Sequence, residues 1–250
     1  MKRLILLVLF LSLAAVSALA DPIPLLDDYA QEYVLQYDEN DPSAGKCEYI
    51  YHYPHPDPAA PGAAPIDSFY AQKSDDSRDF SSLINADYYM INKIPARIEI
   101  SYTVTCNNDR YFSALFTISD MADGNESVSY DANVFSREEG KADSTYTLPQ
   151  MLGILSYTED DEWLQERQTA KAETLVRDMV WDRMQENADQ IEFHDWVEKE
   201  NLEDFFHPEE DFYLDEEGEP VFFMQPGAVA DEKYGLITFR IPLDDILDEL

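Results

Sequence analysis

The sequence DFYLDEEGEPVFFMQPGAVADEKYGLITFRIPLDDIL, residues 211–247, decides the fold of the C-terminal half of the chain. Two apolar runs, residues 212–214 and 221–224, enclose an acidic segment that ends in glycine, and this pattern predicts a β-hairpin. Residues 235–241 carry apolar side chains at every second position and predict a third strand. Pro242 ends that strand, and one closing helical turn is expected after it.

A long helix is predicted upstream of this hairpin, from Glu159 to Asn187. Its apolar residues recur at steps of three and four, which predicts one stripe that packs against a sheet. The stripe consists of Ala172, Leu175, Val176, Met179 and Val180. Shorter helical pieces are expected over residues 67–85, 148–155 and 191–200.

Strand signals dominate the first half of the chain. Residues 97–105 alternate apolar and polar side chains, and residues 111–119 return as the partner strand after a turn. Residues 48–53 and 127–135 predict two further strands. The proline-rich residues 54–65 predict an exposed loop, because proline lacks the backbone donor that regular structure needs.

These elements together predict an α+β fold, in which an antiparallel sheet packs against one long and several short helices. We expect residues 46–250 to form one domain, strand-rich over 46–140 and helix-then-strand over 141–250. Residues 21–45 are expected to be an N-terminal extension made of a short helix and a linker. Hydrophobic residues make up 45% of the chain, enough for a sizeable core.

The N-terminus has the pattern of a cleaved signal peptide. Lys2 and Arg3 precede an apolar run from Leu4 to Val16, and residues 18–20 form a small-x-small cleavage signal. We therefore expect export to the periplasm or the medium, with cleavage after Ala20. A retained membrane anchor would need a longer apolar run. No later segment is apolar enough to span a membrane, so none is expected in the mature chain.

The charge balance is strongly acidic. The chain has 52 acidic and 17 basic residues and a formal net charge of −35. Such a field repels nucleic acid and anionic lipid, and it raises the association rate of cationic partners. The alternative is that the acidity only keeps the protein soluble or adapts it to salt. The expected partner classes are therefore a cationic protein or none, and not nucleic acid.

Cys47 and Cys106 are the two cysteines of the chain. Outside the cytoplasm a pair of cysteines most often forms a disulfide, so we expect one between them. Closing the intervening loop would stabilise the fold by about 4 kcal/mol on the chain-entropy model. Metal binding by two distant thiols is the weaker alternative.

Catalytic signatures are absent from the sequence. His52 and His55 beside Asp57 could bind a divalent metal, but the surrounding prolines favour an exposed loop pair without function. No metalloprotease, nucleophile-elbow or phosphate-loop motif occurs. Carboxylates are too abundant for any pair to indicate glycoside hydrolysis. The sequence thus predicts no catalytic or metal site and no cofactor.

The C-terminal run also resembles the signature of an uncharacterised extracytoplasmic domain family. This family forms the outer part of RsiV, a lysozyme-sensing anti-sigma factor, and accompanies a secreted peptidoglycan deacetylase. Many relatives carry a Gly-Gly-Ala-His segment where this chain has residues 123–127, so a role of that histidine does not transfer. The matching residues are Phe212, Tyr213, Leu214, Gly218, Val221, Phe223, Pro226, Ala230, Gly235, Ile241, Pro242 and Leu243.

The resemblance implies an exported, non-catalytic binding domain whose partner is a cationic cell-wall-active protein such as lysozyme. Two alternatives remain open. One is an accessory envelope protein of structural role. The other, which ranks last, is a hydrolase of cell-wall polysaccharide or an accessory of a deacetylase, because the metal ligands of the deacetylase lie in a separate domain that this chain lacks.

Overall fold

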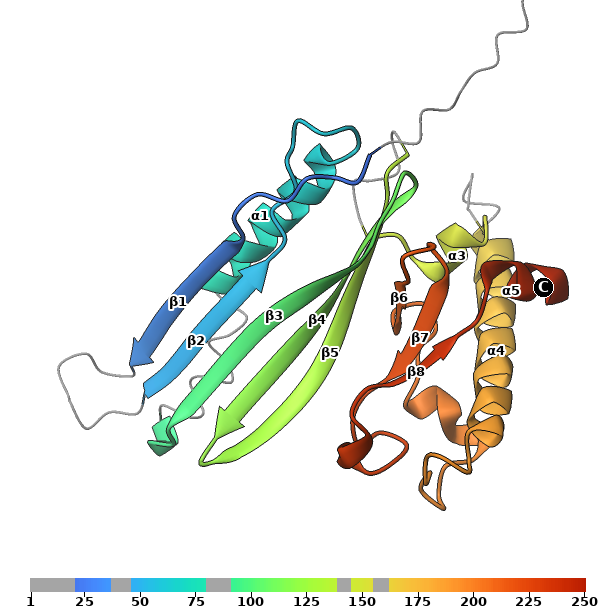
Figure 1. Ribbon diagram of the computed structural model, residues 1–250. Coiled ribbons are helices and arrows are strands. Elements are labelled where there is room, and N and C mark those ends of the chain that lie inside the picture. Colours follow the sequence, from blue (N-terminus) through green and yellow to red (C-terminus); the bar gives the residue numbers. More distant parts are fainter. Residues whose placement is uncertain (1–20, 37–45, 80–90, 139–144, 155–161) are drawn as a thin grey trace, which may run out of the picture.

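The computed structural model describes residues 21–36, 46–79, 91–138, 145–154 and 162–250. They form two sheets, one of five strands and one of three, with helices packed against each (Figure 1). The expected signal peptide and its cleavage site lie outside the described residues. In the part of the chain that is described, no helix combines the length and apolar character that crossing a membrane requires.

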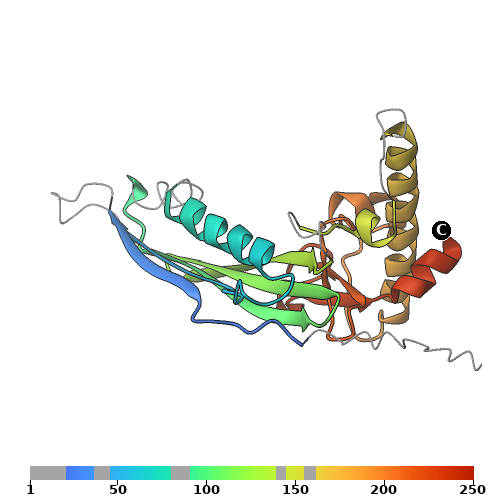
Figure 2. The ribbon, with the colours of Figure 1, turned by 90° about the horizontal axis from the view of Figure 1, so that it is seen from above.

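The first sheet has its strands in chain order, from β1 to β5. Strands β2 and β3 are parallel, and helix α1 (Ala64–Asp79) lies in the connection between them and covers one face of the sheet (Figure 2). All other neighbouring pairs are antiparallel. The strands are β1 (Tyr29–Gln36), β2 (Lys46–Tyr53), β3 (Ala96–Asn107), β4 (Tyr111–Ala122) and β5 (Asn125–Ser136).

An aromatic core fills the space between this sheet and α1. Strand β2 points Tyr49, Tyr51 and Tyr53 to the same face, because every second residue of a strand shares a face. Burying a hydroxyl is unfavourable unless it is hydrogen-bonded. The hydroxyl of Tyr51 bonds to Ser74 at 3.0 Å and that of Tyr53 to Ser77 at 2.8 Å, so α1 supplies the partners.

The C-terminal half is built on the long helix α4 (Glu162–Glu186), which packs against the second sheet (Figure 1). Its antiparallel strands follow the order β6, β7, β8. Apolar residues of both elements form a second core. The remaining elements are β6 (Phe212–Leu214), β7 (Pro220–Met224), β8 (Ile237–Arg240), α3 (Leu148–Met151), α5 (Leu243–Glu249) and the 3₁₀ helices η2 (Lys199–Asp204) and η3 (Glu232–Tyr234).

The structure confirms the α+β class, the long helix and the C-terminal hairpin with its third strand. Along β8, Ile237 and Phe239 are buried and Thr238 is exposed, as the alternation predicts. It adds two features that the pattern did not indicate, the parallel β2–β3 pair and the separate three-stranded sheet. The short helix expected within residues 21–45 is wrong, because β1 pairs with β2 over its whole length.

The expected disulfide between Cys47 and Cys106 is also absent, and both cysteines are free and buried. Cys47 lies opposite Ala96, at the start of β3, whereas Cys106 lies near the end of that strand. The rise of a strand places these two positions of β3 roughly 33 Å apart, and bonded cysteines need Cα atoms within about 7 Å. Burial raises the pKa of each thiol to about 11, which keeps both unreactive.

Candidate functional site

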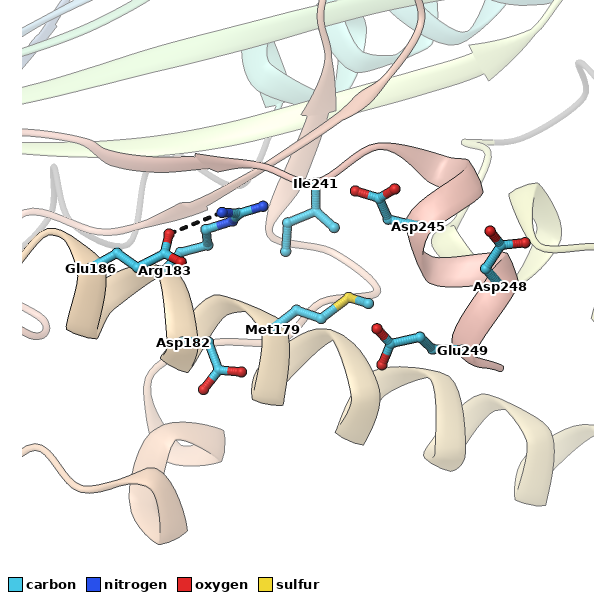
Figure 3. A pocket seen from close by; sticks show the side chains of 8 residues that line it. All are labelled: Met179, Asp182, Arg183, Glu186, Ile241, Asp245, Asp248 and Glu249. Atoms are coloured by element: carbon cyan, nitrogen blue, oxygen red, sulfur yellow. Dashed lines mark hydrogen bonds and ion pairs between the residues drawn. The ribbon is translucent and has the colours of Figure 1, made fainter.

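A cavity of about 370 Å³ lies between α4 and α5 (Figure 3). Helix α4 contributes side chains from its second half, and the segment from the end of β8 through α5 contributes the opposite wall. We call this cavity the α4–α5 groove. It is lined by Met179, Asp182, Arg183, Glu186, Ile241, Asp245, Asp248 and Glu249.

Carboxylates dominate the rim of the groove. Five acidic side chains line it, against the single guanidinium of Arg183. Arg183 Nη1 bonds to Glu186 Oε2 at 2.9 Å within the same helix, so its charge is already paired. All five acidic residues are exposed, and the groove therefore presents a concentrated negative potential to solvent.

Three of the five carboxylates also occupy unfavourable positions for helix stability, whereas Asp245, in the first turn of α5, does not. Glu186 is the last residue of α4, and Asp248 and Glu249 lie in the last turn of α5. The C-terminal end of a helix carries a partial negative charge that favours cations, and each misplaced charge costs roughly 0.3–1 kcal/mol. Arg183, also in the last turn of α4, offsets part of this repulsion. Folding alone would favour basic residues here.

The floor of the groove is apolar. Ile241 is 2% exposed, and Met179 packs against the second core from α4. An apolar floor below a carboxylate rim matches the chemistry of a lysine or arginine side chain, whose aliphatic stem prefers apolar contact while its charged head prefers carboxylates. The groove can therefore accept basic side chains presented by another protein.

The two histidines that the sequence singled out lie at and just beyond the end of β2. His52 Nδ1 is 3.6 Å from a carboxylate oxygen of Asp28, and His55 Nε2 is 3.7 Å from one of Asp67. His55 also packs against the ring of Tyr29 at 4.1 Å between centroids. Each imidazole thus has its own carboxylate partner. Nowhere in the described residues do three metal-binding side chains converge.

Residues of the C-terminal signature serve the fold rather than the groove. Phe212, Leu214 and Phe223 are buried among the strands of the second sheet. Gly218 has φ +86° in the β6–β7 turn, and a Cβ there would approach Tyr111 to 3.1 Å, so glycine is required twice over. The other signature glycine, Gly235, also has a positive φ. Of the signature, Ile241 alone lines the groove.

Pro226 and Gly235, two further members of the signature, line a second cavity at the outer edge of β5. Tyr213 is half-buried and stacks on Phe223 with 6.4 Å between ring centroids. Pro242 precedes α5 at its N-cap position.

The carboxylates of the groove were missed by sequence reasoning, which treated acidic residues as too common to be informative. Asp182 and Glu186 are separated from Asp245 by most of the C-terminal half. A usable signal existed, since acidic residues at the C-terminal ends of both helices oppose the helix dipole. Such placement is a reason to look for a cationic ligand.

Comparisons with known proteins give a family match in the C-terminal half. Residues 164–244 match the family described as "Protein of unknown function (DUF3298)". A DUF3298 family member from Bacteroides fragilis has a similar structure, with 13% identity, a TM-score of 0.46 and coverage of 89% of this chain and 92% of that one. No curated protein matches the chain.

A second similar structure is a DUF3298 family protein from Pseudomonas aeruginosa, with 13% identity and a TM-score of 0.45. The alignment covers 91% of this chain and 94% of that one. The region that matches the DUF3298 family begins in α4 and ends at the start of α5, so it holds the α4 wall of the groove, whereas Asp245, Asp248 and Glu249 of the α5 wall lie beyond it.

Proposed function

We propose that this protein is an exported, non-catalytic binding domain that recognises a cationic protein through the α4–α5 groove. One observation carries the proposal: five carboxylates surround an apolar floor between two helices, and three of them, Glu186, Asp248 and Glu249, lie at helix C-termini, where the dipole disfavours them. These residues reduce the stability of the free protein. A bound cationic ligand would offset the repulsion between the carboxylates and the negative ends of the helices. The net charge of −35 would steer that ligand to the surface.

The first candidate partner is a lysozyme-like enzyme. The resemblance of residues 212–243 to the signature of a domain family with a lysozyme-sensing member supports this choice. Lysozyme is a basic protein, so complementary charge would favour both encounter and orientation. Export, expected from residues 1–20, would bring the two proteins into the same compartment.

The test is calorimetric titration with hen-type lysozyme at about 20 mM and 300 mM salt. Screening removes attraction between exposed charges over this range, because the Debye length falls from roughly 20 Å to below 8 Å. Binding that persists at the higher salt supports a shaped interface. Binding that disappears indicates only nonspecific attraction and contradicts the proposal for this partner, as does the absence of binding at both salts.

Two variants of equal charge sharpen the titration. The first combines Asp245→Asn, Asp248→Asn and Glu249→Gln within the groove. The matched control combines Asp76→Asn, Glu203→Gln and Asp204→Asn, which are exposed acidic residues outside the groove. We expect the groove variant to bind about tenfold more weakly, a loss of about 1.4 kcal/mol, and the control to change little. Equal losses would contradict a local site.

The second candidate is a structural envelope protein whose acidity only maintains solubility. The spread of 52 acidic residues along the chain favours it. A pull-down from envelope extract would discriminate the two, because a tight cationic partner that is lost with the groove variant counts against a purely structural role. Peptidoglycan-degrading activity that disappeared on replacing His52 and His55 would contradict a non-catalytic role.

A further inference from the structure

The outer edge of β5 is partly covered by the C-terminal half. Gln225, just after β7, accepts a hydrogen bond from the Tyr130 N–H at 2.8 Å and donates one to the Tyr130 carbonyl at 2.8 Å. One side chain amide thus imitates the backbone of a neighbouring strand. Both backbone groups of Tyr130 must therefore point away from β4, as in every second residue of an antiparallel edge strand.

The same orientation extends along β5 in both directions, because its register with β4 is regular. Towards the C-terminal end, several of the outward groups have partners. The Ala132 N–H donates to the Asp131 carboxylate at 2.8 Å, and the Val134 carbonyl accepts from the Tyr146 N–H at 2.6 Å. Covering in this way is the usual means by which proteins prevent unwanted pairing at an edge.

Towards the hairpin tip, the covering stops. Val128 and Glu126 lie two and four residues before Tyr130, opposite Ser119 and Met121, so their backbone groups also point outward. Within the described ranges, no group hydrogen-bonds to these outward N–H and C=O groups. Two successive outward residues of a partly covered edge are therefore available for pairing.

A cavity of about 270 Å³ lies directly beside these two residues. Its wall on β5 includes Glu126, Val128 and Tyr130, and its opposite wall includes Pro226, Glu232 and Gly235 from the β7–β8 connection. Figure 1 shows this connection, which contains η3, on the side of the sheet where β5 is the edge strand. The open edge thus faces a bounded space with apolar surface and two carboxylates.

We propose that the open edge of β5 at Glu126 and Val128 binds an extended basic segment of a partner protein by strand addition. Backbone hydrogen bonds to the edge would hold the segment, and Glu126 and Glu232 would select lysine or arginine at alternate positions. Charge argues against a second copy of this chain, since each copy carries −35. The basic character of the segment rests on the proposed function; the strand addition does not.

The probe is an acetylated, amidated peptide of four Val-Lys repeats, titrated against the full mature chain at 300 mM salt with amide exchange followed by NMR. We expect the amides of Val128 and Glu126 to become protected from exchange at least fivefold, while those of β1, the other edge of the sheet, stay unchanged. A second peptide carries a backbone N-methyl group on every residue, which removes the backbone donors of both edges of the strand and keeps all charges.

The methylated peptide separates strand addition from charge. Each backbone hydrogen bond contributes roughly 1 kcal/mol, about a fivefold factor in affinity, so we expect the methylated peptide to bind at least about fivefold more weakly. Equal affinity of the two peptides would overturn the proposal. Protection of Val128 and Glu126 through self-association, detected by ultracentrifugation without peptide, would also overturn it in favour of a second copy.

Two variants at one position complete the test. Val128→Pro removes the outward N–H without breaking a bond to β4, and proline is tolerated at such edge positions. Val128→Ala keeps the N–H. We expect the proline variant alone to lose peptide affinity, by about three- to tenfold. If the proline variant binds the peptide as tightly as the alanine variant while lysozyme binding is intact, strand addition is overturned and the proposed function is not. Loss of lysozyme binding in the groove variant alone supports the proposed function and does not bear on strand addition.

Discussion

The two cores of this protein use different chemistry. The first, between α1 and the five-stranded sheet, buries Tyr49, Tyr51, Tyr53 and Tyr70 with phenylalanines. The second, between α4 and the three-stranded sheet, buries aliphatic side chains and phenylalanine, and among its described buried members there is no tyrosine. The first core therefore depends on the hydrogen-bonded hydroxyls of Tyr51 and Tyr53 as well as on volume, although the buried Tyr70 hydroxyl has no partner among the described residues, whereas the second core depends on volume alone.

The largest effect is expected in the second core. Phe222 lies on β7, is fully buried and contacts Phe206 and Phe212. We expect Phe222→Ala to lower the free energy of unfolding by about 3–5 kcal/mol, because it removes apolar contact and leaves a cavity. Urea denaturation measures the loss. Thr238→Ala, on the exposed side of β8, is the control and should change stability by less than about 0.5 kcal/mol.

A smaller effect is expected in the first core. Tyr53→Phe keeps the ring and removes the hydrogen bond to Ser77, which should lower the free energy of unfolding by about 1–2 kcal/mol. Ser77→Ala removes the same bond from the other side. In a double-mutant cycle the two losses should not add, since they share one interaction. Additive losses would show that the hydroxyl pair does not stabilise this core.

The β6–β7 turn should make the stability of the protein depend on pH, through the carboxyl group of Asp215. Burial alone would raise the pKa of Asp215, but hydrogen bonds from Arg240 and from the backbone of Glu219 outweigh burial and lower the pKa below its ordinary value. The Asp215 carboxylate therefore makes its full contribution to the free energy of unfolding above the unfolded-state pKa of about 3.9. This contribution is lost as pH falls through the folded-state pKa.

We accordingly expect Asp215→Asn to be less stable than the parent at pH 7, and we expect the difference to become smaller at about pH 2, because the parent carboxylate takes up a proton as pH falls. The pair is partly exposed, so the difference at pH 7 should be smaller than that of Tyr53→Phe. Thermal denaturation at both pH values measures it. A difference of the same size at pH 7 and pH 2 would refute the role of this carboxylate.

The smallest change in stability is expected at the C-terminal end of α4. Glu186→Lys places a cation where the helix dipole favours it by about 0.3–1 kcal/mol, but it also removes the exposed ion pair with Arg183, worth about 0–1 kcal/mol, so the net change should stay within about 0.5 kcal/mol. The same change should weaken lysozyme binding. Glu166→Lys, within α4 but far from its C-terminus and outside the groove, is the control. If Glu186→Lys bound lysozyme as tightly as the parent, the groove would not be the recognition site.

Strands with alternating or continuous apolar residues could be predicted from the sequence, whereas β1, whose pattern resembles a helix, could not. Strand β8 was identified because Ile237 and Phe239 alternate with polar neighbours. Strand β1 was missed because Gln31 lies between Tyr29 and Tyr33 on the face directed at α1, so the apolar spacing imitates a helix turn. Pairing with β2 overrides this local pattern, and such pairing is not visible in one segment.

The prediction of a disulfide was wrong for a related reason. Cysteine count and compartment indicate that two cysteines can pair, but only the register of β2 against β3 shows that Cys47 and Cys106 lie far apart. The groove escaped prediction because its walls come from distant segments of a very acidic chain. What the sequence could have indicated is the placement of acidic residues at helix C-termini, where the dipole disfavours them.

The most direct measurement is a chemical-shift titration of the isotopically labelled mature protein with hen-type lysozyme at about 300 mM salt. We predict that the shifted amides concentrate in residues 179–186 and 241–249, which form the two walls of the α4–α5 groove. Small shifts spread evenly over acidic residues of both halves, or shifts confined to residues outside these ranges, would contradict recognition through the groove.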